Sequence, residues 1–373
     1  MRTPKARFIK GTKTIKDEQR FIRRVEDMLD MRGDVAHRET STSFDLCPTS
    51  LADLANRIQI VAWTDLGKPQ FVGQGTFCKV FIGTLGPKKV AAKVLKAEYQ
   101  DNQMAVDDLD AEMRIMGNLN HPHVLEALGR GKMDHCSFVL LEALAKTLAE
   151  TLPGPEETTP IWTRRHSIKS WPLSRAVDCA RQVGDALRYL HFDAFKGFAV
   201  LHRDLKPQNM GFGFDGKLKL FDFGLAKCIH KDGTEETTPC KMTGQTGSIR
   251  YMSPEVALGE PYSRPADVFS WSIILWQMAA HKIPFHGMSA ASHRAKVAQE
   301  GHRPEILEHW PAALSTLLCE CFDANASRRP SFKQVVPCLE SLLEQLERDE
   351  RKQPARRNSS MDSLIQRFSR RCG

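Results

Sequence analysis

Three polar residues in one short segment have the side chains that phosphoryl transfer requires. The segment LHRDLKPQN (201–209) places Asp204, Lys206 and Asn209 within six residues. Transfer of a phosphoryl group to a hydroxyl needs an acceptor for the hydroxyl proton, a positive charge on the moving phosphate and a ligand for a metal ion. A carboxylate, an ammonium and an amide can supply these functions, so the segment predicts a catalytic loop.

A second carboxylate follows thirteen residues after Asn209, in the tripeptide Asp222-Phe223-Gly224. Mg²⁺ in proteins is commonly bound by one or two carboxylates together with the phosphates of a nucleotide. Asp222 and Asn209 therefore form a candidate magnesium site. Either motif alone also fits a loop with a capping aspartate, but chance rarely produces both in this order.

Two earlier segments could bind the phosphates. Gly73 and Gly75 lie in VGQGTFCKV (72–80), where missing Cβ atoms let backbone N–H groups approach phosphate oxygens, although such a pair is also typical of an ordinary hairpin. Lys93 is flanked by apolar strand residues, and an inward ammonium needs an anionic partner because burying a lone charge is costly. Glu112 is the candidate partner; the alternative is an edge lysine exposed to water.

The spacing of apolar residues predicts the elements that must position these groups. Short apolar runs separated by turns between residues 68 and 94 indicate an antiparallel meander. Helical spacing follows at 107–119 and 173–191, and the run 268–280, too short to span a membrane, is expected to be a buried helix. We therefore predict an α+β fold, with a small strand-rich lobe, a larger helical lobe and a cleft between them.

Changes in composition suggest the domain boundaries. We expect a basic N-terminal extension over 1–65, a catalytic domain over 66–346 (small lobe about 66–143, large lobe about 144–346) and a basic, disordered tail over 347–373. Residues 16–31 have the apolar spacing of an amphipathic helix, and 151–172 are expected to be a surface insertion.

The net charge of +8 is concentrated at the two ends. Residues 1–16 carry six basic residues and no acid, and residues 351–373 carry seven basic residues and one acid. Charge on terminal arms favours solvated segments over a nucleic-acid-binding face, so no nucleic-acid partner is expected. No stretch approaches the ~18 apolar residues of a membrane helix, so no transmembrane segment is expected.

The ten cysteines are scattered and form no C-x-x-C pair, which argues against a zinc site. The start of the chain lacks the apolar core of a secretory signal. We therefore expect free thiols and a cytoplasmic location, with the nucleus as the alternative and no organellar targeting.

Taken in order, the motifs resemble the signature set of eukaryotic protein kinases. The segments GQGTFCKV, VAAK, Glu112 before IMGNLNHP, HRDLKPQN, DFG and SPE follow one another between about residues 68 and 346. The resemblance implies a bilobal protein-kinase-like fold, with a small antiparallel β-sheet lobe bearing one main helix and a larger, mainly α-helical lobe. It also implies transfer of the γ-phosphoryl group of ATP, with Mg²⁺, to a protein substrate.

Three later segments are similar to the tyrosine-kinase-like group, most of whose members phosphorylate serine or threonine: GSIRYMSPEV, DVFSWSIILWQM and CFDANASRRPSF. Lys206 with Pro207 is the serine/threonine form of the catalytic loop. Two alternatives stay open, a pseudokinase-type ATP-binding scaffold and a dual-specificity kinase. The sequence does not indicate the substrate, the pathway or the oligomeric state.

The resemblance further implies a role for each matching residue. ATP would be covered by Gly73, Gly75 and Val80 and bound by Ala91, Lys93, Leu141, Glu142 and Leu144, with Leu141 at the back of the adenine pocket. Glu112 would pair with Lys93, Asp204 would be the catalytic base beside Lys206, and Asn209 and Asp222 would bind Mg²⁺. Ser248 would orient the substrate hydroxyl, Glu255 would pair with Arg329, and Asp267 would brace the catalytic loop.

The segment between Asp222 and Glu255 is long and rich in threonine. Arg203 precedes the catalytic aspartate, at the position from which such kinases bind a phosphorylated activation loop. We hypothesise that phosphorylation at Thr243 or Thr246, for example by an upstream activating kinase, orders this segment through new Arg–phosphate hydrogen bonds.

Overall fold

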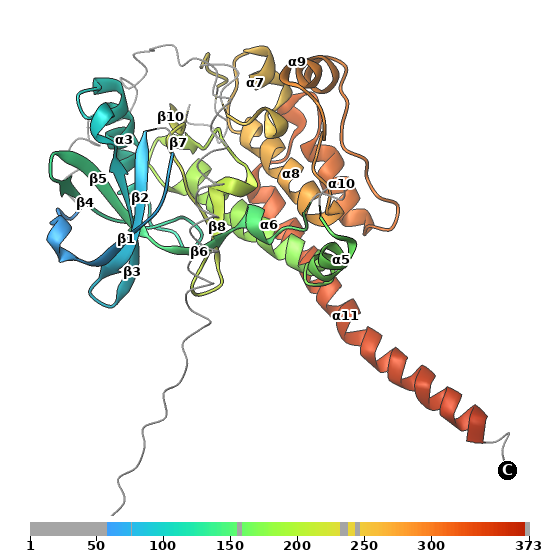
Figure 1. The fold of residues 1–373 in the computed structure, drawn as a ribbon. Coiled ribbons are helices and arrows are strands. Elements are labelled where there is room, and N and C mark those ends of the chain that lie inside the picture. Colours follow the sequence, from blue (N-terminus) through green and yellow to red (C-terminus); the bar gives the residue numbers. More distant parts are fainter. Residues whose placement is uncertain (1–57, 76, 155–158, 232–237, 243–246, 370–373) are drawn as a thin grey trace, which may run out of the picture.

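The computed structural model describes residues 58–75, 77–154, 159–231, 238–242 and 247–369, and gives the backbone alone for Met104, Asp108 and 353–369. The described residues form two lobes, a strand-rich one and a helical one (Figure 1). The predicted bilobal α+β architecture is therefore confirmed.

The small lobe is built on one antiparallel sheet with the strand order β1-β2-β3-β5-β4. Its strands are β1 (Leu66–Gln74), β2 (Cys78–Leu85), β3 (Lys88–Leu95), β4 (Ala127–Met133) and β5 (Cys136–Glu142). Successive side chains of a strand point to opposite faces of the sheet. Val90, Ala92 and Val94 of β3 are accordingly buried in one cluster, whereas Leu95 packs in a different cluster with α3 (Gln103–Met116).

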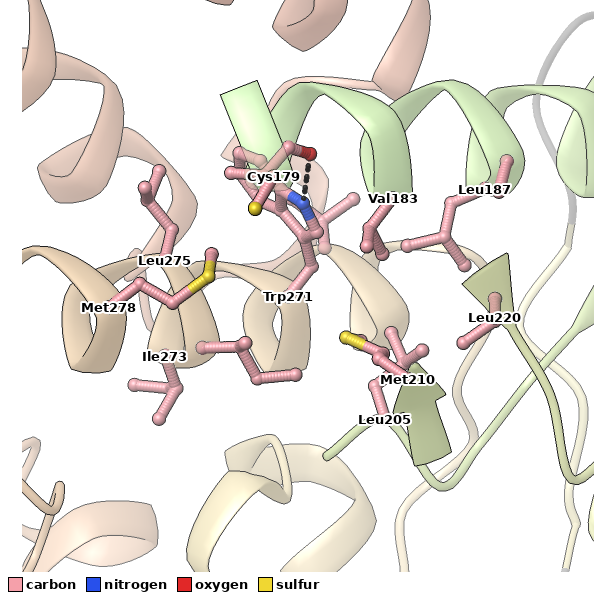
Figure 2. Close-up of a cluster of buried hydrophobic side chains, with 14 of the residues drawn as sticks. Cys179, Val183, Leu187, Leu205, Met210, Leu220, Trp271, Ile273, Leu275 and Met278 are labelled. Atoms are coloured by element: carbon pink, nitrogen blue, oxygen red, sulfur yellow. Dashed lines mark hydrogen bonds between the residues drawn. The ribbon is translucent and has the colours of Figure 1, made fainter. Parts of the chain in front are cut away.

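The large lobe is organised around helices α6 (Leu173–Arg188), α8 (Pro265–Ala280) and α11 (Phe332–Ser369). Most residues of α8 are buried, as expected for a helix that is apolar on all sides. Figure 2 shows its side chains packed with those of α6, and the indole Nε1 of Trp271 donates a 3.0 Å hydrogen bond to the Ala180 carbonyl. Around this core lie α4 (Leu148–Thr151), α7 (Pro254–Leu258), α9 (Ala290–His293) and α10 (Ala312–Cys321).

Two short sheets flank the predicted catalytic loop and the Asp222-Phe223-Gly224 tripeptide. One has the order β6-β8-β9 and consists of β6 (Leu144–Thr147), β8 (Met210–Gly213) and β9 (Leu218–Leu220); the other pairs β7 (Phe198–Leu201) with β10 (Lys227–His230). The predicted catalytic loop connects β7 to β8, and Asp222 follows β9. Strand pairing thus brings both motifs to one side of the helical core.

The end of the chain differs from the sequence expectation. A disordered tail is predicted from residue 347, but α11 continues to Ser369 and projects from the large lobe (Figure 1). The residues that suggested disorder, chiefly Glu, Gln, Lys and Arg, are also good helix formers. Glu347 and Arg351 add an i,i+4 ion pair at 3.7 Å.

The expected surface insertion at 151–172 is also partly wrong. It contains helix α5 (Ile161–Lys169), and the Trp171 side chain is fully buried in the core of the large lobe. Arg164 fixes α5 by donating a 3.1 Å hydrogen bond to the His281 carbonyl at the end of α8. Burial of the large indole ring is strongly favourable, so Trp171 anchors the end of this segment in the core.

Within the described residues, no helix has both the length and the apolar character needed to cross a membrane. No disulfide joins the described cysteines.

A buried histidine should make stability depend on pH. His293 ends α9, is almost fully buried, and neither ring nitrogen has a hydrogen-bond partner among the described residues. Burial, together with the charges of Arg250 and Arg303, lowers its pKa from 6.5 to about 4. Between these two values the unfolded chain binds a proton that the folded chain does not, so stability rises with pH.

We therefore expect the free energy of unfolding to fall as the pH drops from about 6.5 to about 4, and this group to contribute no slope above 6.5. Urea unfolding at several pH values measures this dependence. His293→Leu should flatten the slope, whereas the same substitution at the exposed His166 should leave it unchanged. Equal slopes for wild type and His293→Leu would contradict the expectation.

Candidate active site

Lys93 of β3 and Glu112 of α3 form the ion pair that the sequence predicts. The Lys93 Nζ lies 2.5 Å from the Glu112 Oε2, and both side chains are largely buried. Lys93 shares a face of the sheet with Leu95, which packs with α3 in one buried cluster. An ammonium held by a buried carboxylate has a fixed position, from which it can bind an anion such as a phosphate.

The strand register places the glycine motif beside this lysine. Gly73 of β1 pairs with Val80 of β2, and Val80 pairs with Lys93 of β3. The Gly75 N–H donates a 2.8 Å hydrogen bond to the Cys78 carbonyl and closes the turn between the strands. Val80 and the two glycines therefore lie over the same part of the sheet as the Lys93 side chain.

The residues expected around the adenine lie where the lobes meet. Ala91 of β3 pairs with Leu141 of β5, Glu142 ends β5, and Leu144 begins β6 in the large lobe. The Glu142 carboxylate lies 2.9 Å from the Lys219 Nζ of β9, so an ion pair ties this connection to the large lobe.

Asp204 is the centre of a dense hydrogen-bond network. Its Oδ2 accepts from the Lys206 Nζ at 2.8 Å and from the Asn209 Nδ2 at 3.1 Å. Its Oδ1 accepts from both the backbone N–H and the hydroxyl of Ser248, at 2.9 and 3.0 Å. The carboxylate is mostly buried, and it accepts these four hydrogen bonds from three residues, which fix its position.

Asn209 and Asp222 are suitable ligands for a divalent metal. The Asn209 Nδ2 donates to both the carbonyl and the carboxylate of Asp204, which leaves its Oδ1 without a hydrogen bond from the described residues. The Phe221 N–H donates to the Asn209 carbonyl at 3.0 Å and so holds the DFG segment beside it. No group of three or more His, Cys, Asp or Glu side chains in the described part of the chain could hold a metal. A site with one carboxylate and one amide fits Mg²⁺, which takes its remaining ligands from nucleotide and water.

Asp267 braces the catalytic loop from inside the large lobe, as predicted. This fully buried carboxylate accepts hydrogen bonds from the backbone N–H groups of His202 and Arg203 at 2.9 and 3.0 Å, and from the His191 Nε2 at 3.0 Å. Burial opposes its ionisation, but these donors outweigh it and lower the pKa of the carboxyl. Arg203 has φ of +69°, an unfavourable conformation for a side-chain-bearing residue that the two hydrogen bonds help to maintain.

Glu255 and Arg329 form the other predicted ion pair. It is bidentate, with Nη1–Oε1 at 2.7 Å and Nη2–Oε2 at 2.8 Å, and it is buried. Arg329 also donates to the carbonyls of Asp323 and Pro265. Burial opposes ionisation of Glu255, but the hydrogen bonds and charge of Arg329 lower the pKa of the carboxyl overall.

Glu255→Gln should therefore destabilise the fold by about 3 kcal/mol, because a buried guanidinium is left without its counter-ion. The unfolding temperature should fall by roughly 5–15 °C, measured by calorimetry at pH 7. Because the folded-state pKa of Glu255 is lowered, this stabilisation is lost as the pH falls towards that pKa, and wild type and variant should converge in acid.

The exposed ion pair between Arg351 and Glu347 supplies the control, since such pairs contribute little. Arg351→Ala should leave the unfolding temperature unchanged. A Glu255→Gln variant as stable as wild type would show that the buried pair does not hold the lobe together.

Gly247 is a site residue that the sequence interpretation missed. Its φ is +97°, and a Cβ there would lie 2.5 Å from the Arg203 carbonyl and 3.3 Å from the Asp204 Oδ1. Only glycine allows the backbone before Ser248 to approach the catalytic loop this closely. Tyr262, whose hydroxyl accepts a 2.6 Å hydrogen bond from the Arg203 Nε, was also missed. Both residues contact the catalytic loop from more than forty positions away in the chain, so no short motif around them indicates these contacts.

Thr243 and Thr246, the predicted phosphorylation sites, lie outside the described residues, as does the predicted amphipathic helix at 16–31. The other candidate residues fall into three groups. The small lobe and its junction hold the residues expected to bind ATP, and the loops after β7 and β9 hold the expected catalytic base and metal ligands. The third group consists of Asp267 and the Glu255–Arg329 pair, which are buried in the large lobe.

The fold and the ordered motifs together define a protein kinase domain. The protein kinase domain family matches residues 67–338, which is most of the chain. This chain therefore belongs to the protein kinase family.

Several kinases are about equally similar to it. Dual specificity protein kinase shkB of Dictyostelium discoideum is 30% identical over 278 residues, covering 73% of this chain and 39% of that protein. Mitogen-activated protein kinase kinase kinase 7 of Homo sapiens is 30% identical over 285 residues, covering 76% and 43%. Serine/threonine-protein kinase VIK of Arabidopsis thaliana is 30% identical over 293 residues, covering 76% and 62%. The chain thus matches less than half the length of the first two.

Proposed function

We propose that this chain is a serine/threonine protein kinase that transfers the γ-phosphoryl group of ATP to hydroxyl groups of protein substrates in signal transduction. The observation that carries the proposal is the convergence of Lys206, Asn209 and Ser248 on the Asp204 carboxylate. A scaffold that only bound nucleotide would have no need for a buried proton acceptor held by four hydrogen bonds.

Each group has a defined task in the reaction. The Asp204 carboxylate accepts the proton of the substrate hydroxyl, whose oxygen then forms a bond to the γ-phosphorus as the bond to ADP breaks. Lys206, 2.8 Å from that carboxylate, is placed to neutralise charge on the moving phosphoryl group. Lys93, fixed by Glu112, binds the α- and β-phosphates and keeps the nucleotide in position.

We propose Mg²⁺ as the metal, held by Asn209 and Asp222. When bound, it neutralises phosphate charge between the nucleotide and these two residues. Binding of a fluorescent ATP analogue should weaken when EDTA is added, and Asp222→Asn should lose most of this sensitivity. An affinity that does not depend on Mg²⁺ would contradict the assignment.

Ser248 and Lys206 support serine and threonine as acceptors. The Ser248 hydroxyl is 3.0 Å from the Asp204 Oδ1, where it can orient a short aliphatic hydroxyl toward the base. Phosphoamino-acid analysis of a generic protein substrate tests this assignment: phosphoserine and phosphothreonine are expected. Because a dual-specificity kinase is among the similar proteins, substantial phosphotyrosine would favour that alternative.

We also propose that phosphorylation of Thr243 or Thr246 activates the enzyme. Arg203 donates a 3.1 Å hydrogen bond to the Leu225 carbonyl, and burial and the charge of Arg203 lower the pKa of Lys227 on β10, so two cations lie near each other in the described part of the segment after Asp222. A phosphate would relieve their repulsion. Phosphatase treatment should lower the initial rate, and an unchanged rate would exclude the proposal.

A further inference from the structure

The described chain begins with residues Ile58–Trp63, here called the edge segment, which precede the family match at residue 67. β4 is at one end of the strand order, so among the described strands none pairs with its outer edge. The edge segment occupies that edge (Figure 1). The Arg130 N–H donates to the Gln59 carbonyl, and the Val61 N–H donates to the Arg130 carbonyl, both at 2.9 Å.

Two glycines of β4 allow this contact. A Cβ on Gly131 would lie 2.1 Å from the Val61 carbonyl oxygen, and a Cβ on Gly129 would lie 2.6 Å from the Val61 Cγ2 and 2.9 Å from the Gln59 carbonyl oxygen. Real Cβ atoms do not come so close to backbone, so only glycine at these positions lets the edge segment approach.

Ile58 connects the edge segment to α3. Its side chain is buried in one cluster with Leu109 and Met113 of α3, Leu95 of β3 and Val139 of β5. A Cβ on Gly117, which follows α3, would lie 2.3 Å from the Ile58 Cδ1. Ile58 thus packs where the end of α3 meets the sheet, in contact with the cluster that contains Met113, the residue after Glu112.

Val61 and Trp63 pack against the opposite face of the sheet. Val61 is buried with Val90, Ala92 and Val94 of β3. The Trp63 ring packs edge-on against Phe81 and Phe138, with ring centroids 5.3 and 5.4 Å apart. The edge segment therefore wraps around β4 and contacts both the sheet that carries Lys93 and the helix that carries Glu112.

We propose that the backbone of the edge segment anchors Ile58 as a positioning residue, which keeps α3 in the orientation that maintains the Lys93–Glu112 ion pair. The inference rests on the proposed kinase function. It makes the end of the N-terminal extension necessary for full activity, although this segment contains none of the kinase motifs.

The test compares Ile58→Ala, Ile58→Val and Ile60→Ala in the full chain, each alone and combined with Glu112→Gln. Ile60 is the matched control, because it lies in the same segment with its side chain 79% exposed. Ile58→Ala should lower kcat/KM for ATP by about 3- to 30-fold, a typical size for coupling through packed side chains. Ile58→Val should lower it less, and Ile60→Ala should match wild type.

The combination with Glu112→Gln separates positioning from general destabilisation. If Ile58 acts through the ion pair, Ile58→Ala should have no further effect on kcat/KM once Glu112 has lost its charge. Equal losses in both backgrounds would overturn the proposal, and so would a folded Ile58→Ala variant with wild-type kinetics. Should Ile58→Ala unfold, Ile58→Val gives the same comparison. A wild-type chain without phosphoryl transfer would instead overturn the proposed function.

A reciprocal variant approaches the same contact from α3. Gly117 has helical φ and ψ, so alanine fits its backbone, and an effect of Gly117→Ala must come from the added methyl group meeting Ile58 or the nearby Met113 carbonyl. Gly117→Ala should lower kcat/KM, and Ile58→Ala should cost less in the Gly117→Ala background than alone. Independent, additive losses would count against the contact.

Discussion

Asp204→Asn is expected to lower kcat by about 10²- to 10⁴-fold with little change in nucleotide affinity. The amide has nearly the same shape as the carboxylate, but it cannot accept the proton of the substrate hydroxyl. Lys206, Asn209 and Ser248, which donate to Asp204, are retained in the variant. Initial rates with a generic protein substrate, together with binding of a fluorescent nucleotide, measure the two quantities separately.

Asp215→Asn is a suitable control, because this exposed aspartate lies in the turn between β8 and β9, where it accepts a hydrogen bond from the Lys217 N–H and forms an exposed ion pair with the Lys217 Nζ. Its rate should equal that of wild type. If Asp204→Asn retained a rate within about threefold of wild type, another group would be the base. If wild type itself were as slow as the variant, the scaffold alternative would hold.

Lys93→Met should produce the second large effect, a loss of kcat/KM for ATP of about 10²- to 10³-fold, typical of removing one electrostatic contact to the reacting group. The substitution keeps an unbranched side chain, one heavy atom shorter, and removes its charge. It also leaves the buried Glu112 carboxylate without its partner, so the thermal stability should fall as well. Steady-state kinetics over a range of ATP concentrations and a thermal unfolding curve record both changes.

The same strand provides a matched control. Lys88 also forms a short ion pair, at 2.6 Å from Glu126, but both side chains are about half exposed. Exposed pairs contribute little to stability, so Lys88→Met should leave kinetics and unfolding unchanged. If Lys88→Met and Lys93→Met lost similar amounts of kcat/KM and stability, the effect would come from disturbing strand β3 and not from removing the buried charge.

Sequence reasoning identified those parts of the site that short contiguous motifs encode. The catalytic base, the lysine of the catalytic loop and the metal ligands all lie between Asp204 and Asp222, so their spacing is visible in the chain. The Lys93–Glu112 and Glu255–Arg329 pairs join distant segments. Both followed from the family resemblance, and only the first was also indicated by the need to neutralise a buried lysine.

The contacts that were missed depend on where a backbone lies. Gly131 and Gly247 look like ordinary turn or strand glycines until another segment is seen to approach them within van der Waals distance. The extension of α11 beyond residue 346 was missed for a different reason. A polar, charged composition is shared by solvated helices and by disordered segments, so composition alone does not separate them.

The carboxylate of Asp267 joins the catalytic loop to the first turn of α8, and Trp271 one turn further along is hydrogen-bonded to α6. The loop that carries Asp204 is therefore attached to the helical core of the large lobe. A small shift of α8 would move this catalytic loop with it. Heating that melts the α6–α8 packing should consequently abolish turnover. The loss of activity and the exposure of Trp271, followed by tryptophan fluorescence, should then occur over the same temperature range.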